Sequence, residues 1–164
     1  MESPPPRANC FDASALVKVF ADEPGSEVVR EYFNHRSPTK YTTPFCFYET
    51  LNVLKVKWMY RDQMTKAQYT DAAFRLVAWF EASARYARDI NLTEPTIFFR
   101  AREIVERYSI DLSDAFQILS VKEGYFSHLI NESRTVLVTA DDALAKAAAL
   151  EGVRSWYCLG DSQP

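Results

Sequence analysis

The sequence predicts a single α/β domain built on a parallel β-sheet that is sandwiched between helices. Short strand-like runs alternate along the chain with longer segments in which apolar residues recur every three or four positions, as in strand–helix–strand units. The chain has 164 residues, which is enough for one hydrophobic core and too short for two ordinary domains. We expect the domain to span residues 8–158, with tails at 1–7 and 159–164.

The predicted strands are short, and the predicted helices lie between and after them. The strands cover residues 8–12, 40–43, 135–139 and 153–158. The Pro24-Gly25 pair separates the first two helices. From Pro44, a residue suited to a first helical turn, apolar residues recur at steps of four, three and four as far as Trp58. The predicted helices cover residues 14–21, 26–35, 44–58, 65–85, 93–108, 112–123 and 142–150.

The composition excludes several classes of protein. A net charge of −3, with acids and bases mixed along the chain, lacks the broad basic surface of a sequence-reading DNA-binding domain. No apolar run approaches the roughly 18 residues that span a bilayer, and the first residues have no features of a secretory signal, so we expect a cytoplasmic protein without membrane contact. The cysteines are widely spaced, which favours buried thiols over disulfides: Cys10, Cys46 and Cys158.

Several familiar catalytic motifs are missing from the sequence. There is no GxxxxGK[ST] phosphate loop and no GxSxG nucleophile motif. The two histidines, His35 and His128, are far in sequence from the acidic residues discussed next. Unclustered histidines are more often surface or structural residues, so RNA cleavage by a histidine acid–base pair is poorly supported.

Three aspartates lie where a helix begins. Asp12 and Asp141 follow predicted strands, and Asp114 lies in the first turn of the helix that begins near Leu112. Each one alone is explained by capping, because aspartate is a favoured N-cap residue and interacts well with the helix dipole. However, the carboxyl ends of parallel strands share one edge of the sheet, where such folds bind ligands. We therefore expect the three side chains to lie close together.

A fourth acid, Glu49, interrupts an apolar stripe. On the helix from Pro44, residues 46, 49, 53, 56 and 60 share a face, and the other four are Cys, Val, Val and Tyr. A buried charge is costly unless it finds a partner or becomes neutral. One explanation is an ion pair or hydrogen bond with a nearby arginine, lysine or backbone donor; the other is a shared site with the aspartates.

Together, the four carboxylates predict a metal site: Asp12, Glu49, Asp114 and Asp141. Two carboxylates about 5 Å apart repel by roughly 3 kcal/mol at an effective dielectric near 20. Several in one pocket need a cation, and oxygen ligands suit magnesium or manganese. Ser14 and Thr139, each two residues from one of these aspartates, could orient a carboxylate or a water, although local capping also explains them.

These residues lie in stretches that resemble the PIN domain, and especially the VapC-type toxin ribonucleases: DASALVKVF with DEPGSE, FYETLNVL, DLSDAFQIL and TADDALAKAA. The resemblance covers about residues 8–158 in the family's order. It implies a PIN-like domain with a parallel, about five-stranded sheet and an acidic cluster that binds magnesium or manganese and hydrolyses RNA. Asp12, Glu49, Asp114 and Asp141 match the family's four acids. Asp111 is an extra acid, interpreted first as a helix cap and second as a group near the metal.

We therefore expect a metal-dependent endoribonuclease that leaves 5′-phosphate and 3′-hydroxyl ends, and the resemblance implies the toxin of a type II toxin–antitoxin pair. A small antitoxin protein and a second copy of the chain, in a homodimer, are the implied partners. Four basic residues could contact RNA phosphates, although a solvated helix face also explains such charges: Lys18, Lys55, Lys57 and Arg61.

Two alternatives stay open. One is a catalytically idle PIN-like scaffold that binds RNA or protein. The other is a carboxylate-metal phosphatase of the haloacid dehalogenase type, which needs a second aspartate two residues after the first, where this chain has Ser14.

Overall fold

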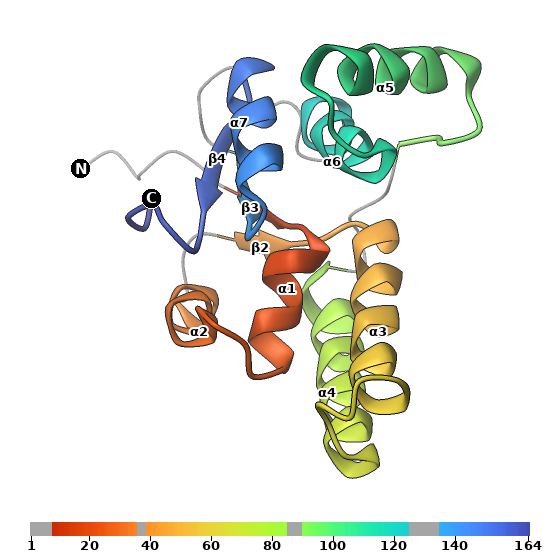
Figure 1. Ribbon diagram of the computed structural model, residues 1–164. Coiled ribbons are helices and arrows are strands. Elements are labelled where there is room, and N and C mark those ends of the chain that lie inside the picture. The colour runs from red at the N-terminus through yellow and green to blue at the C-terminus, as the bar shows by residue number, and fades with distance from the viewer. Residues whose placement is uncertain (1–7, 36–38, 85–89, 125–134) are drawn as a thin grey trace.

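A four-stranded parallel sheet forms the centre of the protein (Figure 1). The computed structural model describes residues 8–35, 39–84, 90–124 and 135–164. The strand order is β2-β1-β3-β4, with β1 (Ala8–Phe11), β2 (Thr39–Tyr41), β3 (Thr135–Thr139) and β4 (Arg154–Tyr157). The four predicted strands and their parallel arrangement are confirmed. The described residues do not form the fifth strand that the resemblance implied.

The predicted helices are also confirmed, with ends that shift by no more than two residues. The fourth continues into a π-helical turn, η1, and its predicted last residue, Arg85, lies outside the described residues. The helices are α1 (Ala13–Phe20), α2 (Ser26–Asn34), α3 (Pro44–Met59), α4 (Lys66–Trp79), η1 (Phe80–Ala84), α5 (Pro95–Tyr108), α6 (Leu112–Glu123) and α7 (Asp142–Leu150).

Strands β1 and β2 end earlier than predicted because side chains replace backbone pairing there. Asp12, the expected last residue of the first strand, is instead the N-cap of α1. β2 ends at Tyr41. The hydroxyl of Thr42 then donates to the Phe11 carbonyl at 2.7 Å, and the Thr43 side chain caps α3. These polar contacts stop the strands at the edge of the sheet from which the helices start.

The sheet separates two hydrophobic cores. Side chains of successive strand residues point to opposite faces, so Cys10 and Leu137 lie in one core and Phe11 and Val138 in the other. Helices α5, α6 and α7 complete the first core, and α1 to α4 complete the second (Figure 1). The predicted sandwich of helices around the sheet is therefore observed.

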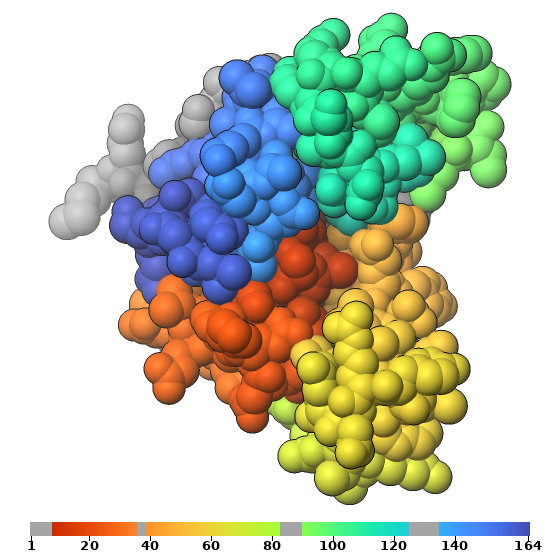
Figure 2. All heavy atoms as spheres, in the orientation of Figure 1, coloured from red at the N-terminus to blue at the C-terminus, as the bar shows by residue number. Residues whose placement is uncertain are grey.

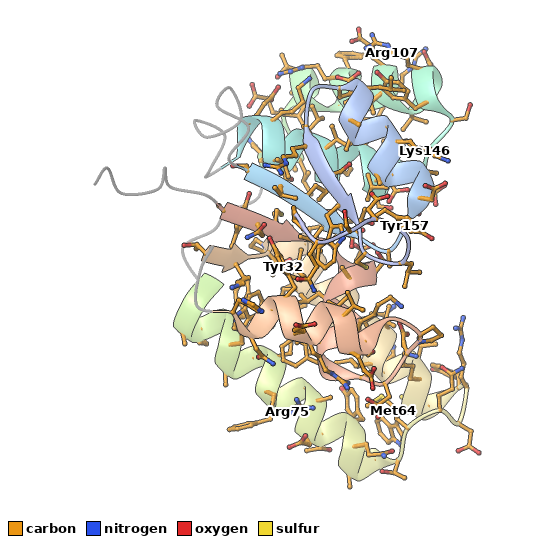
Figure 3. All side chains as sticks on the ribbon, turned by 90° about the vertical axis from the view of Figure 1, so that its left-hand side faces the viewer. Tyr32, Met64, Arg75, Arg107, Lys146 and Tyr157 are labelled. Atoms are coloured by element: carbon orange, nitrogen blue, oxygen red, sulfur yellow. The ribbon has the colours of Figure 1, made fainter. Side chains whose placement is uncertain are left out.

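Buried polar and sulfur groups fit this arrangement. Tyr32 on α2 lies against the sheet (Figure 3), where its hydroxyl donates to Asn9 Oδ1 at 2.8 Å. All three cysteines are free and buried, as predicted. Within the described ranges, none of the helices combines the length and apolar character needed to cross a bilayer.

The residues after β4, expected to be a tail, begin with contacts to the domain. The Trp156 indole nitrogen donates to the Asp161 carbonyl at 3.1 Å, and the Tyr157 amide donates to the Asp161 carboxylate at 3.2 Å. Leu159 lies over Gly25, which is the N-cap residue of α2 and has a positive φ of 85°. Of these residues, Leu159 lines a pocket at the carboxyl edge of the sheet.

Candidate metal and active site

Four helices surround one pocket at the carboxyl edge of the sheet. In Figure 2 the red α1 is visible in the middle of the face, between the blue α7, the teal α6 and the orange to yellow α3. The pocket between them has a volume of about 440 Å³. Its charged and polar lining residues are Asp12, Ser14, Lys18, Glu23, Glu49, Asp114, Gln117 and Asp141. All four predicted acids thus line the same pocket.

The Asp12 carboxylate is buried and held at both oxygens. Its Oδ1 accepts hydrogen bonds from the Ala15 amide at 3.0 Å and the Ser14 hydroxyl at 2.8 Å. Its Oδ2 accepts one from the Thr139 hydroxyl at 2.8 Å. Asp12 therefore caps α1, which was one of the two explanations for an aspartate at this position. It also presents a fixed carboxylate to the pocket.

Ser14 and Thr139 connect two acid-bearing segments. Each hydroxyl donates its one proton to Asp12. Each also accepts a hydrogen bond from a backbone amide of the β3–α7 connection: the Ala140 amide donates to Ser14 at 2.9 Å, and the Asp141 amide donates to Thr139 at 3.0 Å. Asp141 in turn caps α7 by accepting from the Leu144 amide at 3.0 Å. The two hydroxyls therefore fix the Asp12 carboxylate relative to the backbone of Asp141.

Asp114 and Glu49 are different, because neither caps a helix. Among the described residues, Asp114 on α6 has no hydrogen-bond partner, and Glu49 on α3 has one weak contact, from Gln117 Nε2 to its Oε2 at 3.5 Å. The arginine, lysine or backbone partner considered for Glu49 is not found there. Two half-buried carboxylates thus face the pocket without a cationic partner in the described structure.

Burial and mutual repulsion raise the pKa of three of the four acids. Burial, with a smaller contribution from the charge of Asp141, raises the pKa of Asp12 to about 6 against the opposing effect of its hydrogen bonds. Burial and the charges of Asp141 and Asp12 raise the pKa of Asp114 to about 7. Burial and the charge of Asp12 also raise the pKa of Glu49. The pocket therefore concentrates negative charge that an added cation would stabilise.

The donor chemistry fits a hard divalent ion. The four acids supply only oxygen ligands, which magnesium and manganese prefer. Within the described ranges, no three Asp, Glu, His or Cys side chains form a ready-made metal cage. Magnesium commonly keeps several waters and uses one or two carboxylates, so an open acidic pocket suits it better than a closed cage. Asp12, Glu49, Asp114 and Asp141 are the residues that could hold such an ion.

Comparison with known proteins identifies the family. The model of the PIN domain family matches residues 10–150. The chain belongs to the PIN domain family. PIN domains are in general metal-dependent nucleases that act on RNA or DNA. The crystal structure of PAE2754 from Pyrobaculum aerophilum is similar in fold, with a TM-score of 0.54, 17% identity and coverage of 91% of this chain and 89% of that one. No curated protein matches the chain.

Several other residues predicted from the sequence lie away from the pocket of this PIN domain. Asp111 occupies the predicted N-cap position of α6, but its side chain makes no capping hydrogen bond, so the predicted position is confirmed and the side-chain cap is not found. Only its backbone carbonyl takes part, by accepting from the Ala115 amide at 3.1 Å. Lys55 lies over the Tyr60 ring and Arg61 is exposed; neither lines the pocket.

The two remaining basic residues are buried and paired. Lys18 lines the acidic pocket and Lys57 lines a neighbouring one, and both bind Glu23. Of the histidines, His35 is exposed at the end of α2 and His128 lies outside the described residues.

Sequence reasoning missed two polar residues that line the pocket, Glu23 and Gln117. Gln117 follows Asp114 by three positions on α6, so helical spacing alone places both on one face. Its Oε1 accepts from the Cys46 thiol, which directs its amide toward Glu49. Glu23 lies in the connection between α1 and α2, where no periodic pattern indicates the direction of a side chain.

Replacing Ser14 with alanine should lower nuclease activity strongly and the free energy of unfolding only modestly. Two hydrogen bonds would be lost, the one from the Ser14 hydroxyl to Asp12 and the one from the Ala140 amide to Ser14, which costs about 1 kcal/mol of unfolding free energy for each. Loss of a group that orients a metal ligand typically costs 10- to 100-fold in affinity or activity. Ser155→Ala is the matched control, because Ser155 donates to the Ala145 carbonyl at 2.8 Å and does not line the pocket. Equal cleavage rates for the two variants, measured at saturating manganese, would contradict an orienting role for Ser14.

Proposed function

We propose that this PIN domain is a metal-dependent endoribonuclease that hydrolyses RNA to 5′-phosphate and 3′-hydroxyl ends. One observation carries the proposal. Carboxylates from four segments far apart in sequence line a single pocket, and none of the four forms an ion pair with a cationic side chain among the described residues. An arrangement that repels itself in this way is unfavourable for folding, so a binding role explains it better than a structural one.

The chain's own residues supply orientation and proton acceptors. A divalent ion held there would neutralise charge on the phosphate and lower the pKa of water. The hydroxyls of Ser14 and Thr139 keep the Asp12 carboxylate in one orientation. The attacking water forms the new P–O bond and gives up a proton to a carboxylate of the cluster. The bond from phosphorus to the 3′ oxygen breaks, and that oxygen leaves with the electron pair and takes a proton from solvent water.

The cleavage products should therefore carry 5′-phosphate and 3′-hydroxyl ends. Because water attacks and no 2′-hydroxyl takes part, a substrate with a single 2′-deoxynucleotide on the 5′ side of the cut should remain cleavable. Both points can be checked by mass spectrometry of fragments made with manganese. Fragments with 2′,3′-cyclic phosphates would refute the mechanism. Absence of any cut in structured and unstructured RNAs would favour the scaffold alternative, and turnover of a simple phosphomonoester alone would favour the phosphatase.

The proposed biological role is that of a cytoplasmic toxin in a type II toxin–antitoxin pair, acting as a homodimer and inhibited by a small antitoxin. The VapC-like stretches of sequence support it. So do exposed apolar side chains at α3 that a partner helix could cover, namely Tyr48, Met59 and Tyr60. The test is expression in a bacterial host: the chain should arrest growth, the Asp114→Asn variant should not, and the product of an adjoining gene should relieve the arrest.

A further inference from the structure

Two buried lysines share one carboxylate beside the acidic pocket. Lys18 on α1 lies 2.9 Å from Glu23 Oε2, and Lys57 on α3 lies 2.6 Å from Glu23 Oε1. The lysine side chains are only 8% and 10% exposed. We call Lys18, Glu23 and Lys57 the lysine triad. Its two ammonium groups and one carboxylate leave a buried net charge of plus one.

The ammonium group of Lys18 is incompletely satisfied. An ammonium has three N–H donors. Lys57 uses one on Glu23 and another on Gln63 Oε1 at 3.3 Å, whereas Lys18 uses one, on Glu23 alone, among the described residues. Burial raises the pKa of Glu23, but the hydrogen bonds and charges of Lys57 and Lys18 outweigh it and lower that pKa, so the carboxylate stays ionised. A buried donor without an acceptor is costly, and Lys18 lines the pocket.

The triad lies a short distance along two helices from the acids. Lys18 follows Asp12 by six residues and Lys57 follows Glu49 by eight, which is about 9 and 12 Å of helix axis at 1.5 Å per residue. α1 and α3 pack together and both run away from the sheet (Figure 1). Acids therefore lie at one end of this helix pair and the cationic triad at the other.

We propose that the lysine triad is a subsite for a non-scissile phosphate of the RNA substrate. This proposal rests on the proposed nuclease function. A phosphate that enters the pocket accepts the unused donors of Lys18, and Glu23 serves as the internal counter-charge that holds both lysines in place without substrate. Because Glu23 repels the phosphate, it also limits affinity. Lys55 and Arg61, equally cationic, lie outside this subsite.

Steady-state cleavage of a short single-stranded RNA with manganese tests the subsite. Lys18→Met keeps the aliphatic stem and leaves Lys57 and Glu23 as a balanced pair, so the variant should fold. We expect KM to rise about tenfold, which corresponds to about 1.4 kcal/mol, while kcat stays within about twofold. The slope of log affinity against log salt concentration should fall by about 0.7. The control Lys55→Met, which removes a lysine of α3 outside the pocket, should change neither quantity.

The Glu23→Gln variant separates a phosphate subsite from an ion pair that is purely structural. Removing the counter-charge should lower KM even though thermal stability falls. A substrate series with one neutral methylphosphonate linkage at a time should locate the phosphate, because one linkage should raise KM for the wild type and add nothing for Lys18→Met.

The outcomes of this experiment distinguish failure of the subsite from failure of the nuclease proposal. If the wild type cuts RNA but KM is unchanged in Lys18→Met, or rises in Glu23→Gln, the subsite is refuted and the nuclease proposal stands. If the wild type cuts no RNA, both are refuted.

Discussion

Asp114→Asn should abolish metal-dependent RNA cleavage while the protein stays folded. Asp114 is the most informative acid to change, because it makes no capping or other hydrogen bond in the described structure, so the substitution breaks neither a hydrogen bond nor an ion pair there. Loss of a group that only orients a metal ligand lowers metal affinity or activity about 10- to 100-fold. Loss of a ligand itself should therefore lower kcat/KM by more than about 100-fold. Thermal stability without metal should be equal or higher, because one of several repelling carboxylates is gone.

Asp111→Asn is the matched control for this experiment. It makes the same chemical change one helical turn earlier, at an exposed side chain that neither lines the pocket nor caps α6. Its cleavage rate should stay within about threefold of the wild type. Equal losses in both variants would show that general negative charge, and not a specific ligand, explains the effect. Full activity of Asp114→Asn would remove Asp114 from the proposed site.

Asp12→Asn should also abolish cleavage, and should stabilise the metal-free protein at pH 8. The folded protein raises the pKa of Asp12 from 3.8 to about 6. A carboxyl group with a raised pKa keeps its proton in the folded state after the unfolded chain has lost it, so its contribution to stability is present below about pH 4 and is lost as the pH rises to about 6. A shift of this size is worth up to about 3 kcal/mol. Asparagine is an equally good N-cap residue and does not carry the buried charge.

The pH dependence separates this account from simple capping. In the presence of a chelator, urea unfolding should show the wild type less stable at pH 8 than at pH 5, because Asp12 and Asp114 both ionise over that range. The stabilising effect of Asp12→Asn should appear at pH 8 and largely vanish at pH 5. A variant less stable than the wild type at pH 8 would mean that the hydrogen bonds of the Asp12 carboxylate outweigh the cost of its burial.

Metal affinity should rise with pH, whereas the stability of the metal-free protein should fall, because both depend on ionisation of the same carboxylates. Carboxylates must be ionised to act as ligands, so manganese should stabilise the wild type more at pH 8 than at pH 5.5. A gain of 1 kcal/mol corresponds to about 2–4 °C in the melting temperature of a protein of this size. This comparison needs no RNA, and it therefore tests the metal site independently of the substrate.

The parts of the site that depend on backbone order could be predicted from the sequence. An aspartate directly after a strand and before a helix must lie at the carboxyl edge of a parallel sheet, which placed Asp12 and Asp141. The helical face that carries Glu49 was predicted from spacing alone. These inferences work because strand direction and helical periodicity fix where a Cβ atom points.

The parts that depend on side-chain pairing could not be predicted. Nothing in the spacing of Lys18 and Lys57 shows that both bind Glu23, because that residue lies in a connection between helices. Asp111 has the residue type and position of a cap, yet its side chain forms no capping bond. The exact strand ends also depended on the hydroxyls of Thr42 and Thr43, which can bond to the backbone in several ways.

A crystal structure with millimolar manganese at pH 8 tests the central claim most directly, because anomalous scattering locates the ion without any assumption about its ligands. We predict a peak in the pocket, about 2.0–2.2 Å from carboxylate oxygens of at least two of the four acids. A peak there in the wild type that is absent in Asp114→Asn would support the account. A pocket with no manganese at that concentration, or manganese bound only outside it, would contradict it.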